Sequence, residues 1–296
     1  MTPRYLVFAP GYNPDSGGSI FLHELVHALN TLGAPAALWP FHQPRNGNPL
    51  GYIHAFLRRP SILWRRPRFP MAPGRNTPVA FPWHLRRDSI VVYPEITLGN
   101  PLRARNVVRW LLYRPGLRDP YRFGPDEMFF RAGEFCDLPD LTGGAPDLVL
   151  WRINPIYRNE GRKDRKGACY IVRKGEHKPR IPETAEATPI DGLSHAEIAE
   201  IFNRCETFYS YDEATFYSQY AAICGCTSVV VPGLYSTREE WVKNHAPGRY
   251  GIAYGLDDLD HARDTQHLAI SSLQEQEAAG LETVRNFIRL TQERFG

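Results

Sequence analysis

Residues 208–232 carry the pattern of one complete unit of a parallel α/β sheet, and no other stretch of the chain limits the fold as strongly. We expect a helix to begin here with Asp212 as its N-cap and Thr215 in its first turn. Gly225 is expected to end this helix in the left-handed conformation. Residues 227–231 are apolar or β-branched at nearly every position, which predicts a strand buried on both faces of a parallel sheet.

The start of the chain has the same order of strand, loop and helix. Residues 5–9 predict a strand and residues 19–30 a helix, with Gly17 and Gly18 in the loop between them. Unpaired N–H groups and the helix dipole favour an anion at such a helix start, and glycines let a ligand approach the backbone. The pattern therefore predicts either a binding loop for an anionic ligand or a tight turn that needs glycine.

Composition indicates a globular protein of two domains. The chain has 296 residues, of which 43% are hydrophobic and 23% charged, and this length exceeds what one core comfortably serves. A net charge of +3 is too small to indicate a nucleic-acid partner. The five scattered cysteines predict reduced thiols in a reducing compartment. Because no stretch has the pattern of a signal peptide or a membrane span, we expect a cytoplasmic protein.

A basic and aromatic stretch covers residues 45–87. No acidic residue occurs between Glu24 and Asp88, while arginines alternate there with prolines and aromatic residues. Arginine with interleaved aromatic rings suits nucleic acid, an anionic membrane surface or a phosphate-bearing lipid. We therefore expect a peripheral contact with the inner face of a membrane through this stretch. The alternative is an irregular, well-packed connection with solvated arginines.

The first predicted helix contains an HExxH motif formed by His23, Glu24 and His27. On a helix the two histidines share one face, which is the arrangement of a zinc metallopeptidase with the glutamate as general base. Only 22 residues precede the motif, and His42, which follows the Trp39-Pro40 turn, does not fit a third-ligand pattern. A zinc peptidase is therefore kept as an alternative, and His23 is expected to line a cleft as a polar group.

Further strands and helices follow in both halves. Glu95 ends a short apolar strand, and a carboxylate at the carboxyl end of a parallel strand points to where ligands of open α/β sheets bind. Arg173 and Lys174 follow another strand, where two cations either hold a diphosphate or are ordinary surface charges. Beyond these, we expect helices over 104–113, 194–204 and 273–294, strands over 147–151, 169–172, 207–209 and 250–255, and a linker over 152–165.

Three local patterns stand out along the chain. They are Gly17-Gly18 followed by His23, Leu25, Leu29 and Gly33; Tyr93-Pro94-Glu95 with Gly99-Asn100-Pro101-Leu102; and Tyr211-Asp212-x-x-Thr215 with Ala221-Ala222-x-Cys224-Gly225-Cys226. Together these patterns resemble the GT-B glycosyltransferases of bacterial capsule and lipopolysaccharide synthesis. Retaining members of that family carry two glutamates eight positions apart, whereas Glu213 has no such partner. Inversion and retention therefore both stay open.

This resemblance implies an α/β fold with two Rossmann-like domains that face each other across a cleft. The expected domains are residues 1–152 on the acceptor side and residues 153–272 around the nucleotide-sugar, with a terminal helix over 273–296 that packs back on the first domain. The implied activity is metal-independent transfer of a sugar from a nucleotide-sugar donor to a growing surface glycan or glycolipid. No metal or other cofactor is expected, because the nucleotide-sugar is a substrate.

The site residues follow from the same resemblance and from the strand ends. Glu95 is the leading candidate for the catalytic base, with Asp15 and His23 as the others. The expected donor-binding residues are Gly17, Gly18, Arg173, Lys174, Tyr211, Asp212 and Thr215. A non-catalytic nucleotide-binding or glycan-binding module remains, like the zinc peptidase, as an alternative of another class, and a nucleotide-sugar epimerase on the same fold is a closer competitor.

Overall fold

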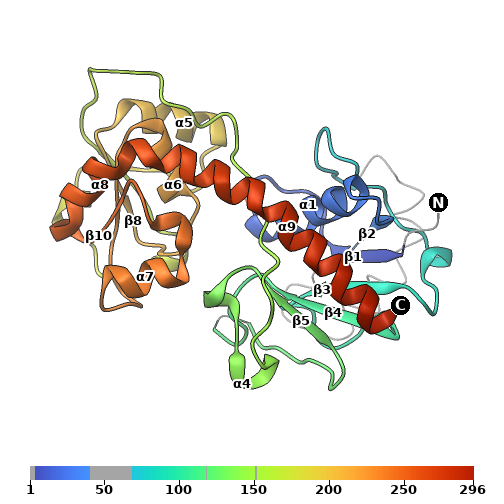
Figure 1. Cartoon of the computed structure of the whole chain (residues 1–296). Helices are drawn as coiled ribbons and strands as arrows, with labels where there is room; N and C mark the ends of the chain where they lie inside the picture. The colour runs from blue at the N-terminus through green and yellow to red at the C-terminus, as the bar shows by residue number, and fades with distance from the viewer. Residues whose placement is uncertain (1–3, 41–68, 118, 151) are drawn as a thin grey trace. The chain divides into compact units, whose positions relative to one another are not determined.

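The structure, a computed structural model, describes residues 4–40, 69–117, 119–150 and 152–296. The chain forms two compact units (Figure 1): unit 1 contains residues 1–150 and 279–296, and unit 2 contains residues 151–278. Each unit holds one five-stranded sheet in which all paired strands run parallel. Helices and loops connect the strands within both units, so each is a Rossmann-like α/β domain, as the sequence predicted.

The sheet of unit 1 has the strand order β2-β1-β3-β4-β5. Its strands are β1 (Tyr5–Ala9), β2 (Ala36–Pro40), β3 (Ile90–Pro94), β4 (Asn106–Leu111) and β5 (Met128–Arg131). The strand predicted for residues 5–9 is confirmed, and so is the strand that ends just before Glu95. Four of the five strands are buried along their whole length, which explains their nearly continuous apolar sequences.

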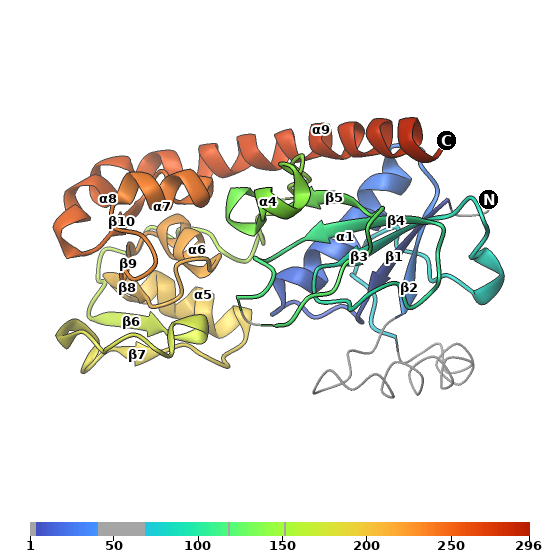
Figure 2. The same ribbon diagram turned by 90° about the horizontal axis from the view of Figure 1, so that it is seen from below.

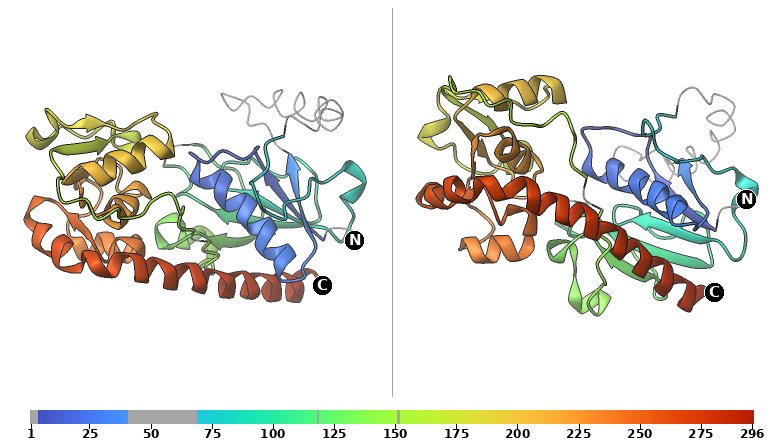
Figure 3. Two further views of the ribbon diagram at one scale, coloured as in Figure 1. Left: turned by 90° about the horizontal axis from the view of Figure 1, so that it is seen from above. Right: turned by 45° about the horizontal axis from the view of Figure 1, so that its top comes forward.

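Two helices cover one face of this sheet (Figure 3): α1 (Gly17–Thr31) and the last turns of α9 (Ala269–Phe295). Tyr5 and Val7 of β1 point to this face, and the alternate residues Leu6 and Phe8 point to a second apolar cluster on the other face. Unit 1 also contains a short helix α4 (Pro139–Thr142) and 3-10 turns at Pro82–His84 and Glu134–Cys136.

The end of α9 completes the core of unit 1. The ring of Phe287 is fully buried, with its centroid 4.7 Å from that of Phe130 and 5.7 Å from that of Tyr5. The Tyr5 hydroxyl lies 2.9 Å from the Thr291 hydroxyl, and the N–H of Val149 donates to Thr283 at 3.1 Å. Residues at the end of the sequence are therefore part of the same core as the first strand.

Unit 2 has the strand order β10-β9-β8-β6-β7. Its strands are β6 (Ala168–Ile171), β7 (Thr188–Pro189), β8 (Thr207–Ser210), β9 (Thr227–Val230) and β10 (Ile252–Tyr254). Its helices are α5 (His195–Arg204), α6 (Tyr217–Cys224), α7 (Arg238–Asn244) and α8 (Leu259–Thr265), together with the first turns of α9. Short 3-10 turns lie at Arg173–Gly175, Pro182–Thr184, Ala246–Gly248, Leu256–Asp258 and Gln266–Leu268. Figure 2 shows α5 and α6 beside the strands of this sheet.

Local signals of unit 2 are confirmed at several positions. Ser194 caps α5 in a capping box with Glu197. Gly225 ends α6 with φ +96°, the left-handed conformation that only glycine adopts without strain. All five cysteines are free thiols and buried, as expected for a chain without disulfides.

Three predicted elements were wrong. Residues 104–113 are not a helix, because Val107, Val108 and Trp110 lie in β4, buried between β3 and β5. Residues 147–151 form no strand where the structure describes them; Asp147 makes only an isolated bridge with Arg131. The apolar run at residues 106–111 was compatible with helix or strand, and pairing with β3 and β5 decided the outcome.

The third error is the start of α6. Asp212 is not its N-cap, because the helix begins at Tyr217. The Asp212 carboxylate instead accepts a hydrogen bond from the N–H of Ala214 at 3.1 Å, which forms a turn two residues after the aspartate. In the described part of the chain, no helix has both the length and the apolar surface that crossing a bilayer requires.

Candidate functional site

In unit 1, three strands end at the same edge of the sheet, because β1, β3 and β4 run parallel. Glu95 follows β3, and its side chain accepts a hydrogen bond from the N–H of Leu112, which follows β4, at 3.0 Å. A Cβ atom at Gly18 would lie 3.8 Å from the side chain of Leu112. The sequence predicted Gly17 and Gly18 in the loop before the helix, whereas they are its first two residues, and Gly18 lies close to the segment that holds the Glu95 carboxylate.

Arg109 fixes the loop that carries Glu95. Its side chain is completely buried in β4 and forms a bidentate ion pair with Glu127 at 2.7 and 2.8 Å. The remaining N–H groups donate to three carbonyls of the loop after β3, those of Pro94 (3.3 Å), Thr97 (2.7 Å) and Gly99 (2.9 Å). All five guanidinium donors are thus used, and the loop is held on both sides of Glu95.

Sequence analysis missed Arg109 because its segment was assigned to a helix. The signal was present, since an arginine within the apolar run Val107 to Leu112 needs a buried partner if the run is a strand. Glu95 itself is only 8% exposed, so its side chain is largely buried at the sheet edge.

The loop between β1 and α1 is held by His23. Its imidazole is completely buried, and its Nε2 lies 3.0 Å from the carbonyl oxygen of Pro10. The ring also stacks on Phe69 and contacts the edge of Tyr12, with centroid distances of 6.3 and 5.4 Å. Burial lowers the pKa of His23, so the ring is neutral at pH 7. Asp15 lies exposed in the same loop.

The HExxH side chains have separate partners. Glu24 pairs with Arg75 at 2.8 Å, and His27 accepts a hydrogen bond from the N–H of Asn76 at 3.1 Å. Within the described residues, no three or more histidine, cysteine, aspartate or glutamate side chains are grouped so that they could hold a metal ion. The arrangement does not favour the zinc peptidase.

In unit 2, Arg173 and the start of α6 lie at the corresponding edge. Arg173 and Lys174 form the 3-10 turn that follows β6, and Asp191 accepts hydrogen bonds from the N–H groups of Val172 and Arg173 at 2.9 and 3.0 Å. The Arg173 guanidinium lies 5.5 Å from the ring centre of Tyr217, the first residue of α6. The structure therefore places one predicted cation beside the helix start.

Tyr211, Asp212 and Thr215 shape the turn that leads into α6. All three side chains are buried. Each accepts a hydrogen bond from a backbone N–H: Tyr211 from Ile181 (2.9 Å), Asp212 from Ala214 (3.1 Å) and Thr215 from Tyr217 (3.4 Å). A Cβ atom at Gly175 would collide with the carbonyl of Tyr211, so the basic turn and this segment pack backbone to backbone. These side chains position the segment from inside the unit.

Glu213, which sequence analysis did not select, joins the loops after β8 and β9. Its buried carboxylate accepts hydrogen bonds from the N–H groups of Gly233 and Leu234, each at 3.0 Å, and from the Tyr254 hydroxyl at 2.6 Å. The ammonium of Lys178 completes the set at 3.0 Å. Glu213 is therefore a structural anion that fixes the edge of the sheet.

The structure describes only part of the basic and aromatic stretch. Residues 45–68 of the predicted stretch 45–87 lie outside the described residues. In the described remainder, Trp83 is 68% exposed and stacks on Phe81 with a centroid distance of 4.6 Å. Arg86 and Arg87, which come after His84 and Leu85, are exposed.

Three solved structures resemble the chain over nearly its whole length, at low similarity. They are MurG of Acinetobacter baumannii (10% identity, TM-score 0.38, covering 98% of this chain and 100% of that one), the glycotransferase of kitacinnamycin (11%, 0.41, 100% of both) and a protein described as a UDP-N-acetylglucosamine 2-epimerase of Listeria monocytogenes (12%, 0.37, 96% and 91%). No protein-family model and no curated protein sequence matches the chain. Similarity at this level carries no argument about activity.

Replacement of Glu213 by glutamine should strongly destabilise the protein. The substitution leaves the buried Lys178 ammonium without its carboxylate, which costs about 3–5 kcal/mol in comparable buried pairs. Urea denaturation measures the loss, and the exposed Glu176→Gln serves as control. The double variant Glu213→Gln/Lys178→Met should be more stable than the single one. An equal effect of Glu213→Gln and Glu176→Gln would contradict this account.

Acid should weaken unit 2 through His245. Burial lowers its pKa to about 4, opposed by Glu213 and supported by Lys174. The unfolded chain, with a histidine pKa of 6.5, binds the proton more readily between these values. Stability is therefore full above pH 6.5 and falls as the pH drops towards 4. From pH 7 to pH 5 we expect a loss of ~2 kcal/mol from this residue.

Urea denaturation at both pH values tests this expectation. His245→Gln should lose less stability than the original protein on going from pH 7 to pH 5, whereas the exposed His267→Gln should lose as much. Equal losses in the original protein and in His245→Gln would show that another group causes the acid effect.

Proposed function

We propose that this protein is a glycosyltransferase that moves a sugar from a nucleotide-sugar donor to a glycan or lipid-linked glycan. The observation that carries the proposal is the meeting of the Arg173 guanidinium with the start of α6 at the carboxyl edge of the unit 2 sheet. Ligands of open α/β sheets bind at this edge, and a helix start with an adjacent cation suits a phosphate group.

Unit 2 holds the donor in this proposal. Arg173 and Lys174 neutralise the diphosphate that leaves when the sugar is transferred, so that no metal ion is needed for this charge. Tyr211, Asp212 and Thr215 fix the segment before α6, because each accepts a hydrogen bond from a backbone N–H. The buried Glu213 fixes the neighbouring loop, which makes the edge rigid before the donor binds.

Unit 1 activates the acceptor. Glu95 is the proposed base, because its carboxylate lies at the sheet edge and is oriented by the N–H of Leu112. In an inverting reaction it takes the proton of the attacking hydroxyl. Gly17 and Gly18 leave room for a substrate near this carboxylate, since among the described residues outside the helix backbone no atom comes closer than 3.8 Å to a Cβ built at either glycine. Asp15 is the second candidate base, and His23 supports the loop.

The acceptor is proposed to be a growing bacterial surface glycan, handled in the cytoplasm at the inner face of the membrane. The exposed Trp83 with Arg86 and Arg87 supports this part of the proposal, because an aromatic ring beside cations suits the interface of an anionic membrane. A nucleotide-sugar epimerase would need no acceptor, and a binding module would show no turnover. These two outcomes separate the alternatives from the transferase.

Binding of nucleoside diphosphates tests the donor site. We expect one of UDP, GDP, ADP or CDP to raise the melting temperature, with or without EDTA, because a ligand of the native state stabilises it. Arg173→Gln should weaken that binding by roughly tenfold, the worth of one charge-assisted hydrogen bond. The exposed Arg162→Gln in the same unit removes the same charge and should bind normally. No shift with any diphosphate, or equal weakening by both variants, would overturn the donor site.

Turnover tests the base. Glu95→Gln should lower the rate of nucleoside diphosphate release from the matching nucleotide-sugar by about 10²–10⁴-fold, while the diphosphate still binds with its original affinity. The exposed Glu134→Gln in unit 1 should keep the original rate. A Glu95→Gln variant with full turnover would remove this residue from the mechanism and make Asp15 the next candidate.

A further inference from the structure

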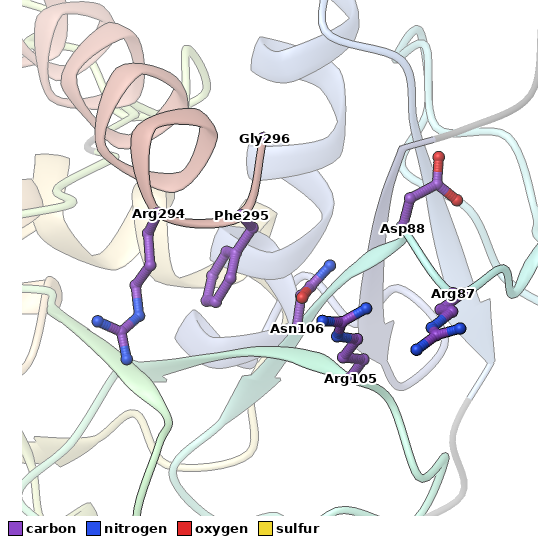
Figure 4. A pocket seen from close by; sticks show the side chains of 7 residues that line it. All are labelled: Arg87, Asp88, Arg105, Asn106, Arg294, Phe295 and Gly296. Carbon is purple, nitrogen blue, oxygen red and sulfur yellow. The ribbon is translucent and has the colours of Figure 1, made fainter.

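A pocket of about 490 Å³ opens in unit 1 at the edge where β3 and β4 begin (Figure 4). This is the edge opposite to the one that carries Glu95, since Glu95 follows the last residue of β3. Its walls come from the segments that enter the two strands and from the last residues of α9. The pocket is therefore separate from the proposed catalytic edge, and nothing in the transfer reaction requires it.

Three arginines from three separate segments line the pocket. Arg87 precedes β3, Arg105 directly precedes β4, and Arg294 belongs to the last turn of α9. Asp88 is the acidic side chain among the lining residues, and in Figure 4 its carboxylate points away from the guanidinium groups of Arg87 and Arg105. Like charges gathered in one concave site create a positive potential that attracts anions.

The three arginines of the pocket form no ion pair with the described residues. Among the described residues, none of these three guanidinium groups lies within ion-pair distance of a carboxylate, although Arg289 on the same helix pairs with Glu293 at 2.8 Å. A further guanidinium lies behind the wall, because Nη2 of Arg4 is 3.5 Å from the position of a Cβ at Gly296. Three guanidinium groups against the carboxylates of Asp88 and of the terminal Gly296 leave the lining with a net positive charge.

The lining also contains an aromatic ring and a buried amide. Phe295 is partly exposed, and the guanidinium of Arg294 lies 5.7 Å from its ring centre. Asn106 is only 8% exposed, and Figure 4 shows its amide between Phe295 and the Arg105 side chain. A ring face next to several fork-shaped donors suits a ligand that combines phosphate oxygens with a flat or cyclic body.

We propose that this pocket binds a small phosphate ester, with its phosphate held by Arg105 and its neighbours and its cyclic body against Phe295. A sugar phosphate and a nucleotide share this chemistry. Arginine recognises the phosphate oxygens through paired N–H donors, which explains why guanidinium groups rather than ammonium groups line the site. This site is additional to the donor site proposed in unit 2 and does not depend on it.

Calorimetric titration of the full chain with inorganic pyrophosphate, at constant ionic strength, tests the anion site. Arg105→Gln and Arg294→Gln should each weaken binding about tenfold. Arg289→Gln is the matched control, because it removes the same charge from α9 outside the pocket and should bind normally. All three side chains are exposed, so the variants should keep their melting temperatures within experimental error.

The Arg173→Gln variant separates the pocket from the donor site. Pyrophosphate binding that survives Arg173→Gln and is lost in Arg105→Gln supports the pocket, whatever the outcome for the donor. Binding that is lost only in Arg173→Gln overturns the pocket and supports the donor site. Two results would overturn both the pocket and the donor site as places where arginine binds pyrophosphate. One is binding that neither Arg173→Gln nor Arg105→Gln weakens, and the other is binding that the control Arg289→Gln weakens equally.

Two further probes distinguish the source of the phosphate and give an independent readout. Glucose 1-phosphate and UMP, titrated into Arg173→Gln, show whether the pocket prefers a sugar body or a base, and the preferred one should bind more tightly than inorganic phosphate.

Phenylglyoxal modifies arginine, and mass spectrometry should show that the preferred ligand protects Arg105 and Arg294 but leaves Arg289 reactive. Equal modification of all three with and without ligand would overturn the proposal.

Discussion

A guanidinium group in the middle of a buried strand is the constraint on which the carboxyl edge of unit 1 depends. Burial of the Arg109 charge without hydrogen-bond or ion-pair partners would strongly destabilise the protein. Transfer of a charge from water to an apolar interior costs roughly several kcal/mol of free energy, even after the surroundings relax. Glu127 and three carbonyls supply that compensation. The loop after β3 must then adopt one shape, since any other shape would leave a buried donor unpaired. The orientation of Glu95 follows from that shape.

In unit 2 a buried charge also holds the loops at the carboxyl edge of the sheet, but this charge is negative. The carboxylate of Glu213 is buried, and two backbone N–H groups, a hydroxyl and Lys178 surround it. In both units a buried ion that belongs to no substrate holds the loops at the carboxyl edge of the sheet. Support of this kind fixes the groups at the sheet edge before any ligand binds, so that binding requires little reorganisation of these loops.

Local sequence patterns predicted most of the fold, but they did not predict the buried ions that hold the loops at the sheet edges. The β-branched run 227–231, the glycine at position 225 and the capping residue Ser194 each act through their own backbone, so the sequence reveals them directly. Arg109 and Glu213 act through partners 10 to 41 residues away in sequence, and only the folded sheet shows those partners. For the same reason the strand at residues 106–111 was mistaken for a helix: pairing with β3 and β5 decides its conformation.

Helix α9 also determines the order in which the protein can be completed during synthesis. Unit 1 begins with the first strand, yet its core includes Val284 and Phe287, which leave the ribosome after all of residues 151–278. Unit 2 is therefore the first part that can bury its whole core, although it is second in the sequence. Until α9 emerges, the apolar face of the unit 1 sheet that Phe287 covers stays open to solvent or to a chaperone.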